Sequence, residues 1–241
     1  MSNAALCEQF AAAGYIVVTL DAPRDAPAVV FTDGTLIDGV PNSDDGYIWP
    51  RVADVRFLLD HLGGLNGLVG ALDVVRIGMF GHSRGGYLSN ICAVEDARIR
   101  AAVNMDGFLW GLWTKGTGLT KFSQDFQARA HALRTPVLRR LGDQGGEERT
   151  RGKVDEEKQD FGGDFISIAI EGTNHGGFGT PWMNGTAKDF ARNVASVPDH
   201  GRSALVRGLL ADFFETYVLK QKSEMALLAA PPAGLSVSSR C

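Results

Sequence analysis

Short apolar runs alternate with longer amphipathic stretches over most of this chain, which leaves few architectures open to it. The apolar runs have the length and β-branched content of buried strands, and they lie at 15–20, 73–80, 99–105, 135–141 and 165–170. Helical periodicity marks the stretches at 5–13, 51–62, 87–94, 122–133 and 202–220. This repeated order predicts an α/β fold with a mainly parallel sheet that helices cover on both faces.

The length of 241 residues suits one such domain, which we expect to occupy residues 1–221. From residue 222 the chain is rich in Ala, Pro and Ser, and this composition predicts a disordered tail over 222–241. Residues 21–45 are rich in Pro, Gly and Asp and lack periodicity. They are expected to form a long loop that is either functional or an excursion at the edge of the domain.

The charge and the cysteine content exclude several classes of protein. The formal net charge is −4, so a broad basic face for nucleic acid is not expected. The three cysteines have no CxxC spacing, which excludes a disulfide framework and the common zinc and redox patterns. The apolar runs are too short to cross a bilayer. We expect neither metal nor cofactor, and a cytoplasmic location is the default, with secretion left open.

Residues 81–85 read Gly-His-Ser-Arg-Gly and match the G-x-S-x-G pattern of a nucleophile elbow. The pattern stands between an expected strand and an expected helix, which is the context that an elbow requires. Ser83 would then project above the sheet, with the backbone N–H of Arg84 directed at a developing oxyanion. The alternative is a tight glycine turn that contains an incidental serine.

A serine nucleophile needs a base, and three histidines follow Ser83 in the chain. His131 lies in an expected helix, and His200 lies in a turn before the last helix. His175 lies in a glycine-rich loop after the expected strand at 165–170, which is the carboxyl end of a strand. This position favours His175 as the general base.

The third member of a triad is a carboxylate that orients the imidazole. Asp106 follows the expected strand at 99–105, and Asp143 follows the expected strand at 135–141. Each aspartate also stands where it could simply shape a turn. The spacing alone leaves these two candidates open.

Five segments together resemble the platelet-activating factor acetylhydrolase family, which includes the plasma and intracellular type II enzymes and their microbial relatives. The matching segments are 6–18 (LCEQFAAAGYIVV), 54–59 (DVRFLL), 72–86 (LDVVRIGMFGHSRGG), 102–109 (AVNMDGFL) and 172–178 (GTNHGGF). The resemblance implies an α/β-hydrolase fold and the triad Ser83–Asp106–His175, with Asp143 as the alternative acid. It also implies calcium-independent hydrolysis of a short or oxidised acyl chain at the sn-2 position of a phospholipid, as by a 1-alkyl-2-acetylglycerophosphocholine esterase.

The resemblance also implies that an N-terminal part is missing from this chain. Members of the family carry a strand and a His-Gly loop ahead of the segment that matches 6–18, and this loop supplies one N–H of the oxyanion hole. We therefore expect an N-terminally truncated domain in which the N–H of Arg84 is the remaining donor. Losing one such donor lowers the rate by a factor of roughly 10²–10³.

Several side chains near the expected triad are candidates for an acyl pocket or a mobile lid, namely His82, Phe108, Trp110, Trp113 and Phe178. An apolar pocket would suit a lipid ester and peripheral contact with lipid surfaces, although aromatic residues also serve as ordinary core packing. One alternative function is that of a general carboxylesterase or a dienelactone-hydrolase-like enzyme. A second is an inactive fragment or a non-catalytic protein on the same fold.

Overall fold

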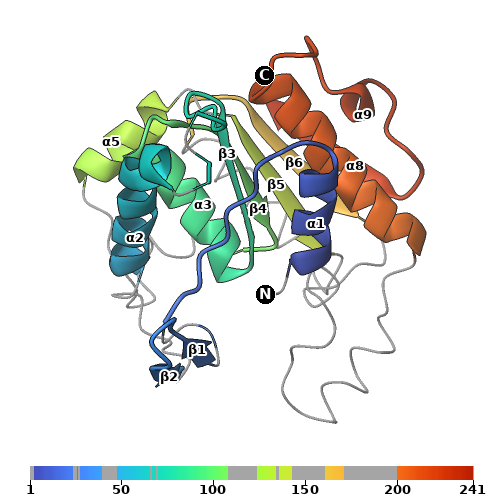
Figure 1. The fold of residues 1–241 in the computed structure, drawn as a ribbon. Coiled ribbons are helices and arrows are strands. Elements are labelled where there is room, and N and C mark those ends of the chain that lie inside the picture. The colour runs from blue at the N-terminus through green and yellow to red at the C-terminus, as the bar shows by residue number, and fades with distance from the viewer. Residues whose placement is uncertain are drawn as a thin grey trace.

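A computed structural model of the protein describes residues 3–23, 26, 28–39, 48–65, 67–68, 70–107, 124–133, 136–142, 161–170 and 200–240. Figure 1 shows the elements in chain order. The helices are α1 (Ala4–Ala12), α2 (Ile48–His61), the 3₁₀ turn η2 (Leu62–Gly64), α3 (Arg84–Glu95), α5 (Gln124–Ala132), α8 (His200–Tyr217) and α9 (Ala226–Ala229). The strands are β1 (Ala28–Val30), β2 (Leu36–Asp38), β3 (Ile77–His82), β4 (Ile99–Met105), β5 (Val137–Gly142), β6 (Phe165–Ile170) and β7 (Leu235–Arg240).

The main sheet has the order β3-β4-β5-β6-β7. The first four strands are parallel to one another, and β7 joins β6 in the antiparallel direction. Parallel neighbours require a crossover between them, and α3 supplies it between β3 and β4, as α5 does between β4 and β5. The mainly parallel α/β sheet that the sequence predicts is therefore confirmed.

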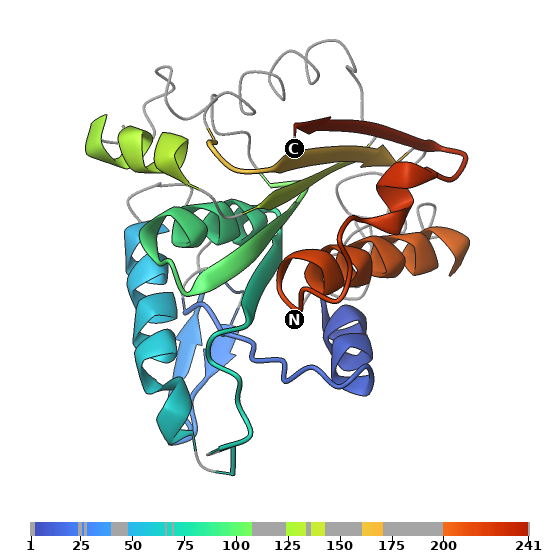
Figure 2. The ribbon, with the colours of Figure 1, turned by 90° about the horizontal axis from the view of Figure 1, so that it is seen from above.

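Helices cover both faces of this sheet (Figure 2). Helices α2, α3 and α5 lie on one face, where their apolar side chains form a core with β4 residues such as Ala102. Helices α1 and α8 lie on the other face and pack against Ala101, Val103 and Met105 of the same strand. Successive strand residues therefore point to opposite cores, which explains why the strand sequences are almost continuously apolar.

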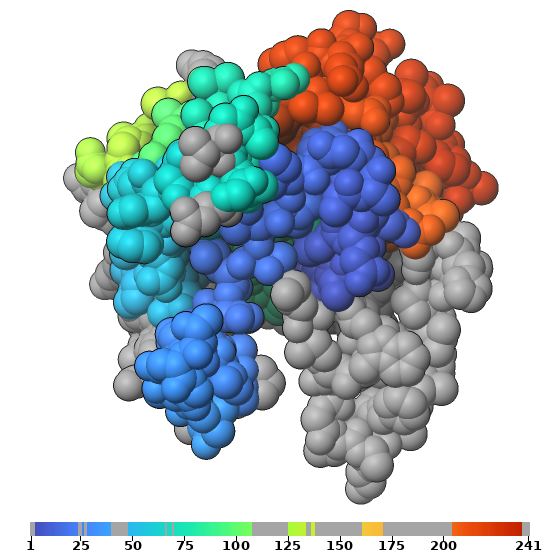
Figure 3. Space-filling view, viewed as in Figure 1, coloured from blue at the N-terminus to red at the C-terminus, as the bar shows by residue number. Residues whose placement is uncertain are grey.

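The apolar run at 15–20 does not form the strand that the sequence predicts. Tyr15 and Val17 pack against the core, whereas Ile16, Val18 and Leu20 are exposed at 45%, 41% and 46%. The alternation of a strand is present, but these residues form no ladder with any strand in the part of the chain that the structure describes. The segment crosses the face of the molecule shown in Figure 3.

The chain after 15–20 contains more structure than the long loop that the sequence predicts there. Strands β1 and β2 form a small antiparallel hairpin with its turn at Asp33-Gly34, and Gly34 has φ +86°. The Asp33 carboxylate accepts a hydrogen bond of 2.8 Å from the N–H of Thr35, which closes the turn. The hairpin projects from the lower left of the molecule in Figure 3.

The C-terminal segment is ordered where the sequence predicts a disordered tail over 222–241. Strand β7 pairs with β6 from Leu235 to Arg240, and Leu235 and Val237 pack against the core. The carboxylate of Asp212 in α8 binds the ammonium of Lys222 at 2.8 Å and accepts a hydrogen bond from the N–H of Leu227 at 3.1 Å. Pairing and polar contacts hold this segment, and its composition does not reveal either of them.

Candidate active site

Ser83 stands on a sharp turn between strand β3 and helix α3. Strand β3 ends at His82 and α3 begins at Arg84, so a single residue joins the two elements. Ser83 has φ 56° and ψ −122°, which is a rare backbone conformation for a residue with a side chain. Such a conformation costs on the order of 1–3 kcal/mol and tends to occur at functional sites. The local geometry is that of a nucleophile elbow.

Two glycines allow this turn to form. A side chain at Gly81 would collide with the backbone of Gly85, and one at Gly86 would collide with Asn104 and lie 2.8 Å from the carbonyl oxygen of Gly81. The N–H groups of Gly86 and Tyr87 donate hydrogen bonds of 3.0 and 3.1 Å to the carbonyl oxygen of Ser83. These bonds start the helix directly at the serine.

Asp106 lies beside this turn because strands β3 and β4 are parallel and paired in register. His82 is opposite Met105, so Ser83 and Asp106 are the next residues of two neighbouring strands. The N–H of Ser83 donates a 2.9 Å hydrogen bond to the carbonyl oxygen of Met105. Asp106 also has a positive φ, of 54°. The structure therefore brings two of the predicted site residues to one edge of the sheet, each on a strained turn.

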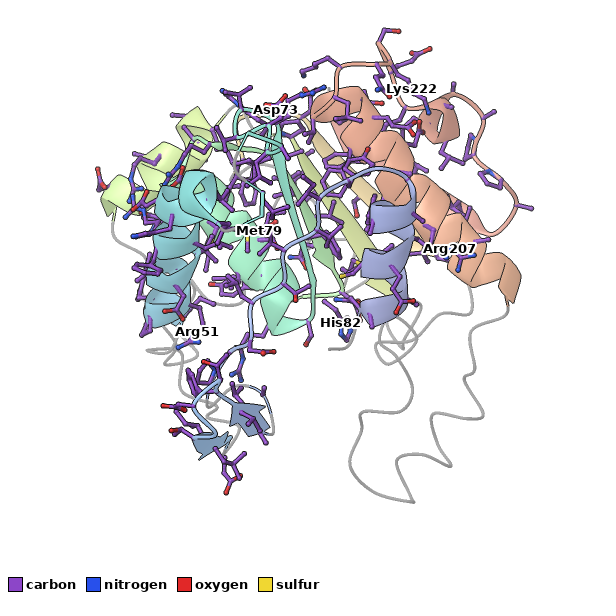
Figure 4. The ribbon with its side chains drawn as sticks, viewed as in Figure 1. Arg51, Asp73, Met79, His82, Arg207 and Lys222 are labelled. Atoms are coloured by element: carbon purple, nitrogen blue, oxygen red, sulfur yellow. The ribbon has the colours of Figure 1, made fainter. Side chains whose placement is uncertain are left out.

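The remaining predicted site residues are placed only in part. His82 is half-buried at the carboxyl end of β3, where Figure 4 labels it, and Arg84 is the first residue of α3. The other six lie outside the described residues: Phe108, Trp110, Trp113, Asp143, His175 and Phe178. Strand β5 ends at Gly142 and β6 at Ile170, which is the same edge of the sheet as the end of β3. The triad and the choice of acid remain predictions.

Sequence reasoning missed Asn104 and Gly107. Asn104 is completely buried in β4, and its side-chain oxygen accepts a 2.7 Å hydrogen bond from the N–H of Gly107. A side chain at Gly107 would collide with the carbonyl oxygen of Ser83. The available signal in the sequence was the single amide within the run 101–105, where the other residues are apolar. A buried polar group needs a hydrogen-bond partner, so such an amide indicates a specific contact.

Cys92 lies on α3, the helix that follows Ser83, and its environment disfavours a role as a nucleophile. It is buried in α3, and this burial, together with Asp96 and Glu95, raises its pKa to about 12. A thiol with such a pKa holds almost no thiolate near neutral pH. Among the described residues, no group of three or more His, Cys, Asp or Glu side chains is placed to hold a metal ion.

The fold is that of the α/β-hydrolases: a ferulic acid esterase from Streptomyces cinnamoneus superposes with a TM-score of 0.73 over 97% of this chain and 68% of its own, at 24% identity. A protein of Arthroderma benhamiae named as a probable 1-alkyl-2-acetylglycerophosphocholine esterase is 39% identical over 108 residues. That match covers 44% of this chain, and the chain spans only 27% of the length of this relative. No family model matches the chain.

No helix among the described residues combines the length and apolarity that a membrane span requires. The described part of the site lies at the carboxyl ends of β3 and β4 in an α/β-hydrolase fold, where the half-buried Ser83 is next to the half-buried Asp106.

Proposed function

We propose that this chain is a serine esterase that hydrolyses a short acyl ester, with a 1-alkyl-2-acetylglycerophosphocholine as the favoured substrate. The observation that carries the proposal is Ser83 at φ 56° between β3 and α3, directly beside Asp106. A serine is placed in this conformation at a strand-to-helix turn when its hydroxyl must project from the sheet. The partial match to a relative named for this esterase activity supports the substrate class.

The proposed reaction is acyl transfer in two steps. His175 takes the proton of the Ser83 hydroxyl as the oxygen attacks the ester carbonyl, and Asp106 stabilises the imidazolium. The N–H of Arg84 donates to the oxyanion of the tetrahedral intermediate. The alcohol then leaves with the proton from His175, and water attacks the acyl-enzyme through the same groups to release the acid.

The test of this function is hydrolysis of p-nitrophenyl acetate and of a 1-alkyl-2-acetylglycerophosphocholine by the purified protein. We expect Ser83→Ala to abolish turnover of both esters. Asp106→Asn should lower kcat by about 10⁴-fold, as expected when the imidazole loses its orienting acid. Asp143→Asn should leave kcat within a few-fold of the wild-type value.

The two aspartate variants form a matched pair because each follows a neighbouring parallel strand. If Asp143→Asn abolishes turnover and Asp106→Asn does not, the acid is assigned to the wrong strand end. A series of acetyl, butyryl and octanoyl esters then distinguishes the proposed short-chain specificity from that of a general carboxylesterase. An equal kcat/KM across this series would contradict the proposed substrate class.

A further inference from the structure

We propose that Asn104 is a positioning residue that holds the turn of Asp106 against the turn of Ser83. The inference rests on the proposed function, since it concerns how the acid is kept beside the nucleophile. Asn104 is two residues before Asp106 in β4 and is completely buried. Its neighbours Val103 and Met105 point to the opposite core, so Asn104 faces helix α3.

The oxygen of the Asn104 side chain closes the turn that carries Asp106. It accepts the 2.7 Å hydrogen bond from the N–H of Gly107, three residues ahead. Asp106 lies inside this closed turn with φ 54°, a left-handed conformation that is uncommon for residues with a side chain and that aspartate tolerates better than most. The bond from Asn104 is one of the contacts that hold it.

The same oxygen also lies against the nucleophile elbow. A side chain at Gly86 or at Gly107 would collide with it. The first turn of α3 and the Asp106 turn therefore both pack closely against this one oxygen. Gly107 in turn lies against the carbonyl oxygen of Ser83, and a side chain there would come within 2.8 Å of the backbone nitrogen of Tyr87. Asn104 therefore sits where the two strained turns meet.

The side-chain nitrogen of Asn104 indicates that asparagine does not occupy this position for stability alone. Nδ2 is buried and has no hydrogen-bond partner among the residues that the structure describes, which is unfavourable for a polar group. An apolar side chain of similar size would remove the unpaired donor, but it would also remove the acceptor that Gly107 uses. The amide thus serves the turn through its oxygen and carries an unsatisfied nitrogen in return.

Asn90 offers a matched control. It is an asparagine of equal burial on α3, and within the described part of the chain neither of its side-chain polar atoms has a hydrogen-bond partner. It therefore forms no hydrogen bond through its side chain with the described residues of the Ser83 and Asp106 turns. Asn90→Leu therefore removes a buried amide from the same core without changing the junction of the two turns.

The experiment compares Asn104→Leu, Asn104→Asp and Asn90→Leu with the wild type. We expect Asn104→Leu to lower kcat by about 10–100-fold with KM within about twofold, and Asn90→Leu to leave both unchanged. Asn104→Asp keeps an acceptor oxygen for the Gly107 N–H in either protonation state, so the Gly107 amide should stay protected from exchange in this variant.

Hydrogen exchange at the Gly107 amide tests the inference independently of activity. We expect this amide to be protected in the wild type and in Asn90→Leu, and to exchange faster in Asn104→Leu. Unchanged kcat or unchanged Gly107 protection in a folded Asn104→Leu protein would overturn the inference, as would an equal loss of kcat in Asn90→Leu. If Asn104→Leu does not fold, the exchange of the Gly107 amide in Asn104→Asp decides, and loss of its protection in that folded variant overturns the inference. An inactive wild type contradicts the proposed function instead, and the exchange measurement still tests the role of Asn104.

Discussion

Three glycines set the geometry of the site at the scale of single residues. Gly81, Gly86 and Gly107 each lie so close to a neighbouring backbone or to Asn104 that no side chain fits. Gly85 belongs to the same G-x-S-x-G pattern, but a side chain there would point into open space. The pattern therefore contains one glycine that the packing requires and one that it does not.

This difference leads to a prediction within the motif. Gly86→Ala forces a methyl group against Asn104 and the Gly81 carbonyl, so it should destabilise the protein by about 1–3 kcal/mol and lower kcat sharply. Gly85→Ala should leave activity within a few-fold of wild type and change stability by less than about 1 kcal/mol. Chemical denaturation and ester hydrolysis measure both effects. Similar losses in the two variants would show that the elbow is not packed as described.

At the scale of helices and strands, ion pairs and hydrogen bonds connect neighbouring elements. Arg98, just before β4, forms ion pairs of 2.6 Å with Asp96 and 2.8 Å with Asp60 of α2. The hydrogen bond from Arg98 is the main cause that lowers the pKa of Asp96 below its ordinary value, against the opposing effect of burial. These bonds join α2 to the turn between α3 and β4.

The lowered pKa of Asp96 predicts a dependence of stability on pH. A carboxyl with a depressed pKa in the folded state stabilises the protein above the unfolded pKa of about 3.9, and the contribution is lost as pH falls through the folded pKa. Because Arg98 is partly exposed, we expect at most about 1 kcal/mol. Asp96→Asn should reduce the slope of stability between pH 5 and pH 3, measured by urea unfolding. An unchanged slope would contradict this assignment.

Asp212 makes polar contacts between elements near the C-terminus, as Arg98 does beside β4. Its carboxylate is buried and joins α8 to Lys222 and to the first turn of α9, on the upper right of Figure 4 where Lys222 is labelled. Lys222 also contacts the more exposed Glu215 at 2.6 Å. This cluster precedes β7, which completes the sheet.

We predict that Asp212→Ala releases the segment that follows α8. The variant leaves the Leu227 N–H without its acceptor and the Lys222 ammonium with Glu215 as its remaining ion-pair partner of this cluster, and it should destabilise the protein by about 1–3 kcal/mol. Hydrogen exchange should rise over 225–240 before it rises in β3 and β4. Glu215→Gln removes only the exposed contact of Lys222 and should have little effect. Uniform exchange across the sheet in Asp212→Ala would contradict the role of this contact.

At the scale of the whole molecule, the sequence predicts the parallel strands of the core correctly, but its predictions are wrong for the run at 15–20 and for the C-terminal segment that contains β7. Strands such as β4 and β6 are buried on both faces, so their apolar runs identify them without knowledge of their neighbours. The run at 15–20 has the same composition, but no described strand pairs with it. Strand β7 shows the converse: its Ser-rich sequence does not predict a strand, yet it forms one by pairing with β6. Strand formation at a margin depends on a partner, which local sequence does not contain.

The sequence predicts those site residues that directly follow a strand, because parallel strands end at the same edge of the sheet. The G-x-S-x-G pattern after a strand predicts Ser83, whereas the strand ends leave Asp106 and Asp143 open and only the family resemblance favours Asp106. Parallel pairing in register places Ser83 and Asp106 together. The role of Asn104 and the contact of Gly107 with the elbow depend on packing between β4 and α3, which the chain order does not reveal. Asp143 and His175 lie outside the described residues, so their roles rest on sequence reasoning.

The central claim is that Ser83 is an activated nucleophile, and a fluorophosphonate probe tests it most directly. The folded protein is treated with the probe, digested, and the modified residue is located by mass spectrometry. We predict stoichiometric labelling on Ser83, with labelling slowed strongly in Asp106→Asn and absent in Ser83→Ala. A folded protein that stays unlabelled, or that carries the label on another serine, would contradict the account.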